Sequence, residues 1–145
     1  MKIRIPHGDD IRYTETHEWA RKETDTLISI GITEYAVKEL GDIVYIELPE
    51  DVESQIEAKE AFGTIESVKA VSDLISPLTG KIVQVNESIS DAPEELADDP
   101  YEEGWLIKIE VEDSSEFEDL MTAEEYIEYL KEESSEPVEI DDEEE

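Results

Sequence analysis

The 145-residue sequence contains no cysteine. The chain therefore cannot form a disulfide, bind a metal through thiolates or use a cysteine nucleophile, and any sulfur chemistry needs an attached group. Histidine is scarce as well, since His7 and His17 are the only two. No Ser-His-Asp spacing, glycine-rich phosphate loop, HExxH sequence or calcium-loop sequence is present. We therefore expect a protein that is not an enzyme and has no metal site.

Positive charge is also scarce. The chain has 11 Lys and Arg against 43 Asp and Glu, for a formal net charge of −32. So acidic a chain repels the phosphates of nucleic acid and the anionic surface of a membrane, and we expect it to bind neither.

Long hydrophobic runs are missing too. Residues 1–6 alternate basic and apolar side chains and lack the apolar stretch of a secretory signal, and no segment has the length and hydropathy of a membrane span. A cytoplasmic setting is the default expectation.

Composition divides the chain into two parts. Nine of the fourteen residues from 132 to 145 are acidic, and only Val138 and Ile140 among them could bury apolar surface. We predict one domain over residues 1–131 and an acidic disordered tail over 132–145. The other acidic residues are spread over the domain, which suggests a high-salt setting or partners with basic docking surfaces.

Short apolar runs separated by Gly, Pro and Asn predict a mainly antiparallel β fold within the domain. The expected strands are 27–30, 43–48, 61–68, 73–76, 81–86 and 105–111. Residues 43–46 suggest the period-two alternation of a half-buried strand.

Two segments have helix signals. Thr33 is a candidate N-cap for a short helix over 34–40 that ends at Gly41. A second, C-terminal helix opens near Thr122, with Glu125 in a capping-box relation. We expect its aromatic residues to pack the helix on the sheet, and Trp19 and Trp105 to be core or strand-end packing residues.

The segment over residues 65–73 differs from the rest of the chain because Lys69 lies between two apolar, β-like stretches. Position alone predicts an exposed lysine at a hairpin tip. With its flanks, this stretch resembles the H protein family of the glycine cleavage system, whose members carry lipoic acid. The matching segments are Arg12-Tyr13, His17-Glu18-Trp19, Gly31-Ile32-Thr33, Leu40-Gly41-Asp42-Ile43-Val44-Tyr45, Leu48-Pro49-Glu50, Glu66-Ser67-Val68-Lys69-Ala70-Val71-Ser72-Asp73, Ser76-Pro77, Val85-Asn86-Glu87, Pro100-Tyr101 and Gly104-Trp105.

The resemblance implies a fold and an attachment site. The fold would be a lipoyl-domain-like, flattened barrel-sandwich of two antiparallel sheets, with a short helix and a C-terminal helix. Lipoic acid would be joined covalently to the side chain of Lys69, and Glu66 would be read by the lipoylating enzyme. Biotin domains have methionine on both sides of their lysine, whereas Val68 and Ala70 stand there in this sequence.

The resemblance also implies a carrier role in glycine catabolism and one-carbon metabolism. The arm would take the aminomethyl group of glycine from glycine decarboxylase, a pyridoxal-phosphate enzyme, and deliver it to an aminomethyltransferase that uses tetrahydrofolate. Dihydrolipoyl dehydrogenase would reoxidise the dithiol. The carrier, expected to be a monomer, would catalyse none of these steps.

Two acidic residues correspond to family positions that hold the loaded arm in a surface cleft. These are Glu18 and Asp73, and a carboxylate suits the primary ammonium of an aminomethyl group. The sequence departs from the family at Glu39, where a histidine near the cleft is common, and over residues 51–59, where two usual glycines are replaced.

Alternatives from other classes stay open. An H-protein-like carrier could use the same Lys69 for lipoate relay to other proteins or for another pathway. An unmodified interaction protein would tolerate Lys69→Arg, and an acidic mimic of nucleic acid would bind DNA-binding proteins.

Overall fold

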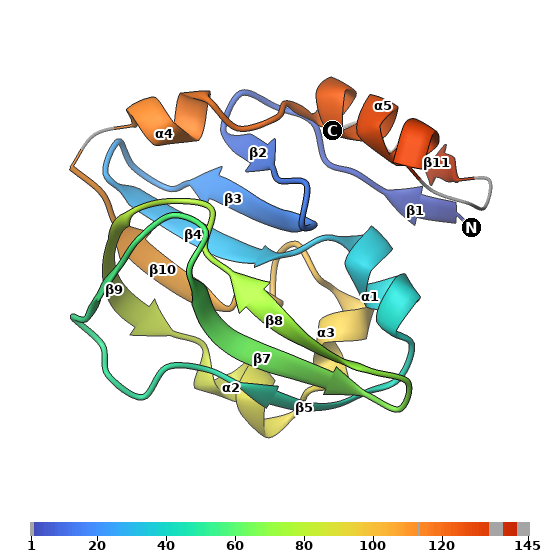
Figure 1. Ribbon diagram of the computed structural model, residues 1–145, viewed down its shortest axis with the longest axis horizontal. Helices are drawn as coiled ribbons and strands as arrows, with labels where there is room; N and C mark the ends of the chain where they lie inside the picture. The colour runs from blue at the N-terminus through green and yellow to red at the C-terminus, as the bar shows by residue number, and fades with distance from the viewer. Residues whose placement is uncertain (1, 113, 134–137, 142–145) are drawn as a thin grey trace.

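The computed structural model describes residues 2–112, 114–133 and 138–141. Two antiparallel sheets form the body, as predicted (Figure 1). The larger is open and has six strands, in the order β2 (Ile11–Tyr13), β3 (Glu18–Lys22), β4 (Leu27–Ile32), β10 (Ile107–Glu110), β9 (Gly80–Val85) and β6 (Gln55–Ile56). The smaller has the order β5 (Ile43–Glu47), β7 (Ala61–Ser67) and β8 (Val71–Ile75).

Five helices surround the sheets in the described residues. Beyond β2 and β3, at the top of Figure 1, lie α4 (Ser115–Glu118) and α5 (Ala123–Glu133), while α1 (Glu34–Leu40) lies close to the β7–β8 turn. Two further short helices, α2 (Glu87–Asp91) and α3 (Glu95–Asp98), follow β9 and were not anticipated from the sequence.

Both predicted helices are confirmed by their caps. The Thr33 side chain accepts a hydrogen bond from Ala36 N, and Gly41, with φ of 81°, donates its N–H to Val37 O. At the start of α5, Thr122 N donates to Glu125 Oε1 at 3.0 Å and Glu125 N donates to Thr122 Oγ1 at 3.2 Å. This reciprocal pair is the capping box that the sequence indicates.

The core has two parts. One lies between the sheets and contains Ile30, Ile46, Ile65 and Leu74, each at most 1% exposed. The other lies where α5 covers β2 and β3, around Trp19 and the stacked rings of Tyr13 and Tyr126. Trp19 is a core residue as predicted, and its Nε1 donates to Pro100 O at 3.0 Å. Trp105 is only partly buried and packs against the same cluster.

The period-two expectation for residues 43–46 is wrong. Ile43 and Ile46 are buried, whereas Val44 and Tyr45 are 53% and 47% exposed. The pairing of β5 with β7 shifts register between Ile43 and Tyr45, so a bulge places two successive side chains on the exposed side.

The predicted disordered tail is also wrong for the part of it that the structure describes. Helix α5 continues through Glu133, and β11 (Glu139–Asp141) pairs in parallel with β1 (Lys2–Arg4). Val138 and Ile140 pack against the second core cluster, so two apolar residues suffice once β1 offers a backbone edge. Residues 134–137 and 142–145 of the expected tail lie outside the described residues.

Candidate functional site

The β7–β8 hairpin carries Lys69 at its turn, where the side chain is exposed. The two strands pair in register from Ile65 opposite Ser72 to Glu66 opposite Val71. Ser67 N then donates to Ala70 O at 2.8 Å, which leaves Val68 and Lys69 as the two residues of the loop. Paired strands therefore hold the lysine out from the body, as the sequence predicts.

The turn is built without glycine. Lys69 N and Ala70 N both donate to Ser67 Oγ, each at 3.1 Å, so a side-chain oxygen replaces part of the usual backbone bonding. None of the turn residues has positive φ, although the primed turns common in two-residue hairpins need it. Val68 N donates to Asp42 O at 3.0 Å, which fixes the turn to the loop between α1 and β5.

The stem of Lys69 lies beside Gly41 at the C-terminal end of α1. A Cβ atom built on Gly41 would stand 3.6 Å from Lys69 Cε. The side chain therefore runs from the turn toward the end of α1, where the next residues, Leu40 and Glu39, line a cavity.

This cavity has a volume of about 260 Å³ and lies between α1, β8 and the start of β3. Its lining combines apolar and polar residues: Thr16, His17, Glu18, Ile32, Tyr35, Ala36, Glu39, Leu40, Ile65, Ser72, Asp73 and Leu74. Both acidic residues predicted for an arm cleft, Glu18 and Asp73, thus border one cavity next to the Lys69 stem. Whether they hold a loaded arm stays a prediction.

Glu18 is a buried acid, with 2% of its surface exposed. Its Oε1 accepts hydrogen bonds from Thr14 Oγ1 at 2.9 Å and from Thr16 Oγ1, and its Oε2 accepts Ile75 N at 3.1 Å. Burial raises the pKa of this carboxyl from 4.5 to about 7, against the opposing effect of these hydrogen bonds. Glu18 is therefore poised to change charge near neutral pH, whereas Asp73 is exposed on the edge strand β8.

Glu66, the expected recognition residue, lies away from the cavity. It is partly buried on β7, where it pairs with Tyr45 on one side and Val71 on the other. The structure thus separates Glu66, beside the turn, from Glu18 and Asp73 at the cavity.

His17 forms a network that the sequence did not indicate. Its backbone has φ of 73°, and its Nδ1 lies 2.8 Å from Tyr126 Oη, which in turn lies 2.8 Å from Thr33 Oγ1. Burial lowers the pKa of His17 to about 4, so the ring is neutral at pH 7. The network ties the cavity wall to α5 across 109 positions of sequence, a separation that no local pattern could reveal.

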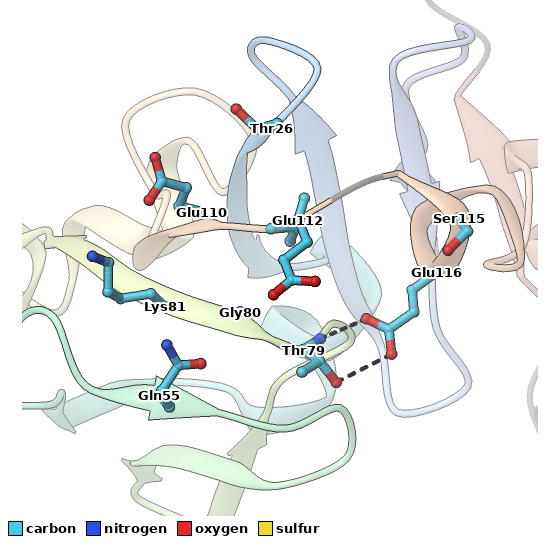
Figure 2. A pocket seen from close by; sticks show the side chains of 10 residues that line it. Thr26, Gln55, Thr79, Gly80, Lys81, Glu110, Glu112, Ser115 and Glu116 are labelled. Carbon is cyan, nitrogen blue, oxygen red and sulfur yellow. Dashed lines mark hydrogen bonds between the residues drawn. The ribbon is translucent and has the colours of Figure 1, made fainter.

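A larger cavity of about 670 Å³ lies elsewhere, between the start of β9, the end of β10 and α4 (Figure 2). Lys81, Glu110 and Glu112 line it, and the Glu116 carboxylate accepts hydrogen bonds from Thr79 N at 2.8 Å and Thr79 Oγ1 at 3.1 Å. Lys69 is not part of its lining. Among the described residues, no group of three or more His, Asp or Glu is placed to hold a metal ion, and no helix is long and apolar enough to cross a bilayer.

Comparison with known proteins gives a consistent result. The profile of the Glycine cleavage H-protein family matches residues 11–133. A glycine cleavage system H protein of Vibrio parahaemolyticus is 47% identical over 123 residues, which cover 85% of this chain and 97% of the relative. That of a Geobacillus species is 52% identical over 123 residues, covering 85% and 95%.

A solved structure is similar as well. The crystal structure of a glycine cleavage system H protein from Mycobacterium marinum has a TM-score of 0.74 and 38% sequence identity, and the match covers 86% of this chain and 97% of that one. Residues 1–10 and 134–145 lie outside the family match.

Proposed function

The chain belongs to the glycine cleavage H-protein family and is a lipoyl carrier of the glycine cleavage system, and on that premise we propose that Lys69 bears the lipoyl group. The observation that carries the proposal is the placement of Lys69. It is exposed at the tip of a fixed hairpin, and its stem runs toward a cavity with a partly apolar lining.

The residues around Lys69 suit a lipoyl arm. Leu40, Ile65 and Leu74 offer apolar contacts for a hydrocarbon chain, and Thr16 and Ser72 offer hydroxyl groups. When attached, the lipoyl group supplies disulfide and dithiol chemistry, which a chain without cysteine cannot supply itself. The protein holds the attachment point, presents it and shelters its cargo.

Attachment forms an amide. The Lys69 ammonium loses one proton, and the free amine attacks the carboxyl carbon of an activated lipoyl donor. The leaving group departs with the electron pair of its bond to that carbon, and Nζ loses a second proton. Glu66, three residues before Lys69, is the residue we assign to recognition by the lipoylating enzyme.

Glu18 and Asp73 are the residues we assign to the ammonium of the aminomethyl cargo. Both border the cavity that the Lys69 stem approaches, Glu18 as a buried residue and Asp73 from the exposed edge strand β8. A cation beside Glu18 favours the ionised carboxyl and opposes the raised pKa of about 7. Retention of the cargo should therefore weaken as the pH falls below 7.

Membership of the glycine cleavage system supports partner enzymes. We propose that they are glycine decarboxylase, aminomethyltransferase, dihydrolipoyl dehydrogenase and the lipoylating enzyme, and that the chain is a monomeric carrier, their common substrate, which catalyses no step itself. A tether raises the effective concentration of the arm for each docked enzyme. A cytoplasmic setting stays a prediction.

The test is mass spectrometry of protein purified from its native host. The peptide containing Lys69 should carry the mass of one lipoyl group, and the Lys69→Arg variant should carry none. A Lys81→Arg variant, which changes another lysine far from the turn, should be modified like the wild type. An unmodified Lys69 in native protein would overturn the proposal and favour an interaction protein.

A further inference from the structure

Exposed apolar side chains gather around the Lys69 turn. Val44, Tyr45, Val68 and Val71 are 53%, 47%, 68% and 66% exposed. The remaining large apolar side chain of comparable exposure in the described residues, Val52 at 50%, lies in the loop between β5 and β6. Apolar surface concentrated at one place on a monomer is a common mark of an interaction site.

Strand register puts this surface on one face of the small sheet. Tyr45, Glu66 and Val71 stand opposite one another across β5, β7 and β8, and directly opposed residues share a face. The adjoining row of Ile46, Ile65 and Ser72 has the other orientation, and its two isoleucines are at most 1% exposed in the core. The bulge in β5 adds Val44 to the exposed side.

The same face is acidic in the row next to Tyr45, Glu66 and Val71, on the side away from the turn. The next outward row pairs Glu47 with Thr64 and Thr64 with Asp73, and both carboxylates are exposed. The three strands contain no lysine or arginine. A complementary surface would therefore present an apolar patch with basic side chains beside it.

We infer that this outer face of the small sheet, defined by Val44, Tyr45, Glu66 and Val71, is the docking surface for the enzyme that acylates Lys69. The inference rests on the proposed attachment at Lys69. An unmodified lysine has only a four-carbon stem, so the acylating active site must come down onto the turn itself. Later partners meet a longer arm and can act at a greater distance from the sheet.

The test is the acylation rate of the full, unmodified chain by purified lipoate ligase with lipoic acid and ATP, at carrier concentrations below KM. Val71→Thr keeps a β-branched side chain and the strand preference, and Val71→Lys places positive charge opposite the basic partner. We expect kcat/KM to fall by about fivefold in the first variant and by about a hundredfold in the second, through a higher KM.

Val52→Thr and Val52→Lys are the matched controls, because Val52 has similar exposure and lies in the loop between β5 and β6, outside the three strands and the Lys69 turn, although it borders one cavity with Tyr45. They should be acylated like the wild type, and all four variants should keep the wild-type thermal unfolding midpoint. Equal rates for the Val71 and Val52 variants would overturn the docking surface while leaving the attachment at Lys69 intact. A wild-type chain that ligase does not acylate at Lys69 would instead overturn the proposed function.

Two further measurements test whether this surface binds a different partner. A wild-type dimer in sedimentation that dissociates in Val71→Lys would assign the face to a second copy of the chain. Normal acylation of the Val71 variants, with slowed turnover of their lipoylated forms by dihydrolipoyl dehydrogenase, would assign it to a later partner. Either result contradicts the inference.

Discussion

The Ser67 hydroxyl organises the turn that presents Lys69. It accepts hydrogen bonds from two successive backbone N–H groups, Lys69 N and Ala70 N. Ser67→Ala removes both, so the turn keeps only its backbone bonds from Ser67 N to Ala70 O and from Val68 N to Asp42 O and becomes less rigid, while the strands behind it keep their pairing. We expect the unfolding free energy to fall by about 1 kcal/mol and kcat/KM for acylation of Lys69 to fall by about tenfold.

Ser67→Thr is the conservative control, because threonine keeps the oxygen. Acylation kinetics with purified ligase and denaturant unfolding of both variants make the check. Equal losses in the alanine and threonine variants would show that the hydroxyl does not position the lysine.

Glu18 gives the protein a measurable dependence on pH. Its pKa is about 7 in the folded protein against 4.5 for an unperturbed carboxyl, so between these values the folded state binds more protons than the unfolded one. The contribution of Glu18 to stability is therefore fully present below pH 4.5 and is lost as the pH rises toward and through 7. The full contribution of Glu18 to the free energy of unfolding is about 3 kcal/mol.

Chemical denaturation of wild type and Glu18→Gln from pH 4 to pH 8 isolates this effect. The difference in unfolding free energy should shift in favour of the variant as the pH rises and level off above pH 7. The comparison is needed because His17, whose pKa is lowered to about 4, changes stability in the opposite sense over part of this range. A constant difference would show that Glu18 titrates normally.

Local sequence indicates some residues of the site, whereas others come together only through the fold. The exposed turn position of Lys69 could be anticipated from its local sequence, and the cavity positions of Glu18 and Asp73 could be anticipated because their segments resemble a family. The backbone N–H of Ile75 that donates to Glu18 could not, since it comes from a strand 57 positions away. The link from His17 to Tyr126 was missed for the same reason.

At the scale of elements, β1 fastens α1, which forms one wall of the cavity. Arg4 N donates to Glu34 Oε1 at 2.5 Å, the Arg4 guanidinium lies 3.3 Å from Glu34 Oε2, and Lys38 Nζ donates to Lys2 O at 2.8 Å. Glu34 and Lys38 are four positions apart on the helix and so face β1 together.

Glu34→Ala should therefore loosen α1 as well as β1. Loss of a buried acceptor and its ion pair should lower the unfolding free energy by about 1–3 kcal/mol and speed hydrogen exchange of the α1 amides. Glu39→Ala, at an exposed position of the same helix, is the control. Unchanged hydrogen exchange of the α1 amides in the Glu34 variant would show that β1 does not stabilise this wall of the cavity.

Elements were predictable where their signals are local. Caps at Thr33 and Thr122 lie within four residues of the groups they bond, and both helices were located correctly. The bulge in β5 interrupts the alternation of buried and exposed side chains. It arises from the pairing of β5 with β7, so the sequence of β5 alone does not indicate it. The β1–β11 pair was missed because its partners stand 137 positions apart.

At the scale of the whole molecule, the net charge of −32 opposes compactness. Like charges repel less when salt shortens the screening length, which is about 30 Å at 0.01 M and about 3 Å at 1 M. We expect the thermal unfolding midpoint to rise by about 5 °C or more between 0.01 M and 0.5 M NaCl, and then to level off. Differential scanning calorimetry makes the check.

Sucrose, which is uncharged, is the control and should give no rise that saturates at low concentration. A midpoint that does not move with salt would mean that the acidity serves partner docking and not adaptation to a saline setting. The excess charge itself was visible in the composition, whereas its distribution over one face of the small sheet needed the strand register.

The pairing of β1 with β11 has a consequence for the order of events on the ribosome. Residues 2–4 emerge before their strand partner, residues 139–141, and both sheets of the body are synthesised between them. At about 5–20 residues per second, this delay is on the order of ten seconds. During it, Ile3 and Ile5, which end up 1% and 3% exposed, belong to a cluster that lacks its last apolar members. A nascent chain stalled before residue 139 therefore carries an open strand edge, which is a binding target for chaperones.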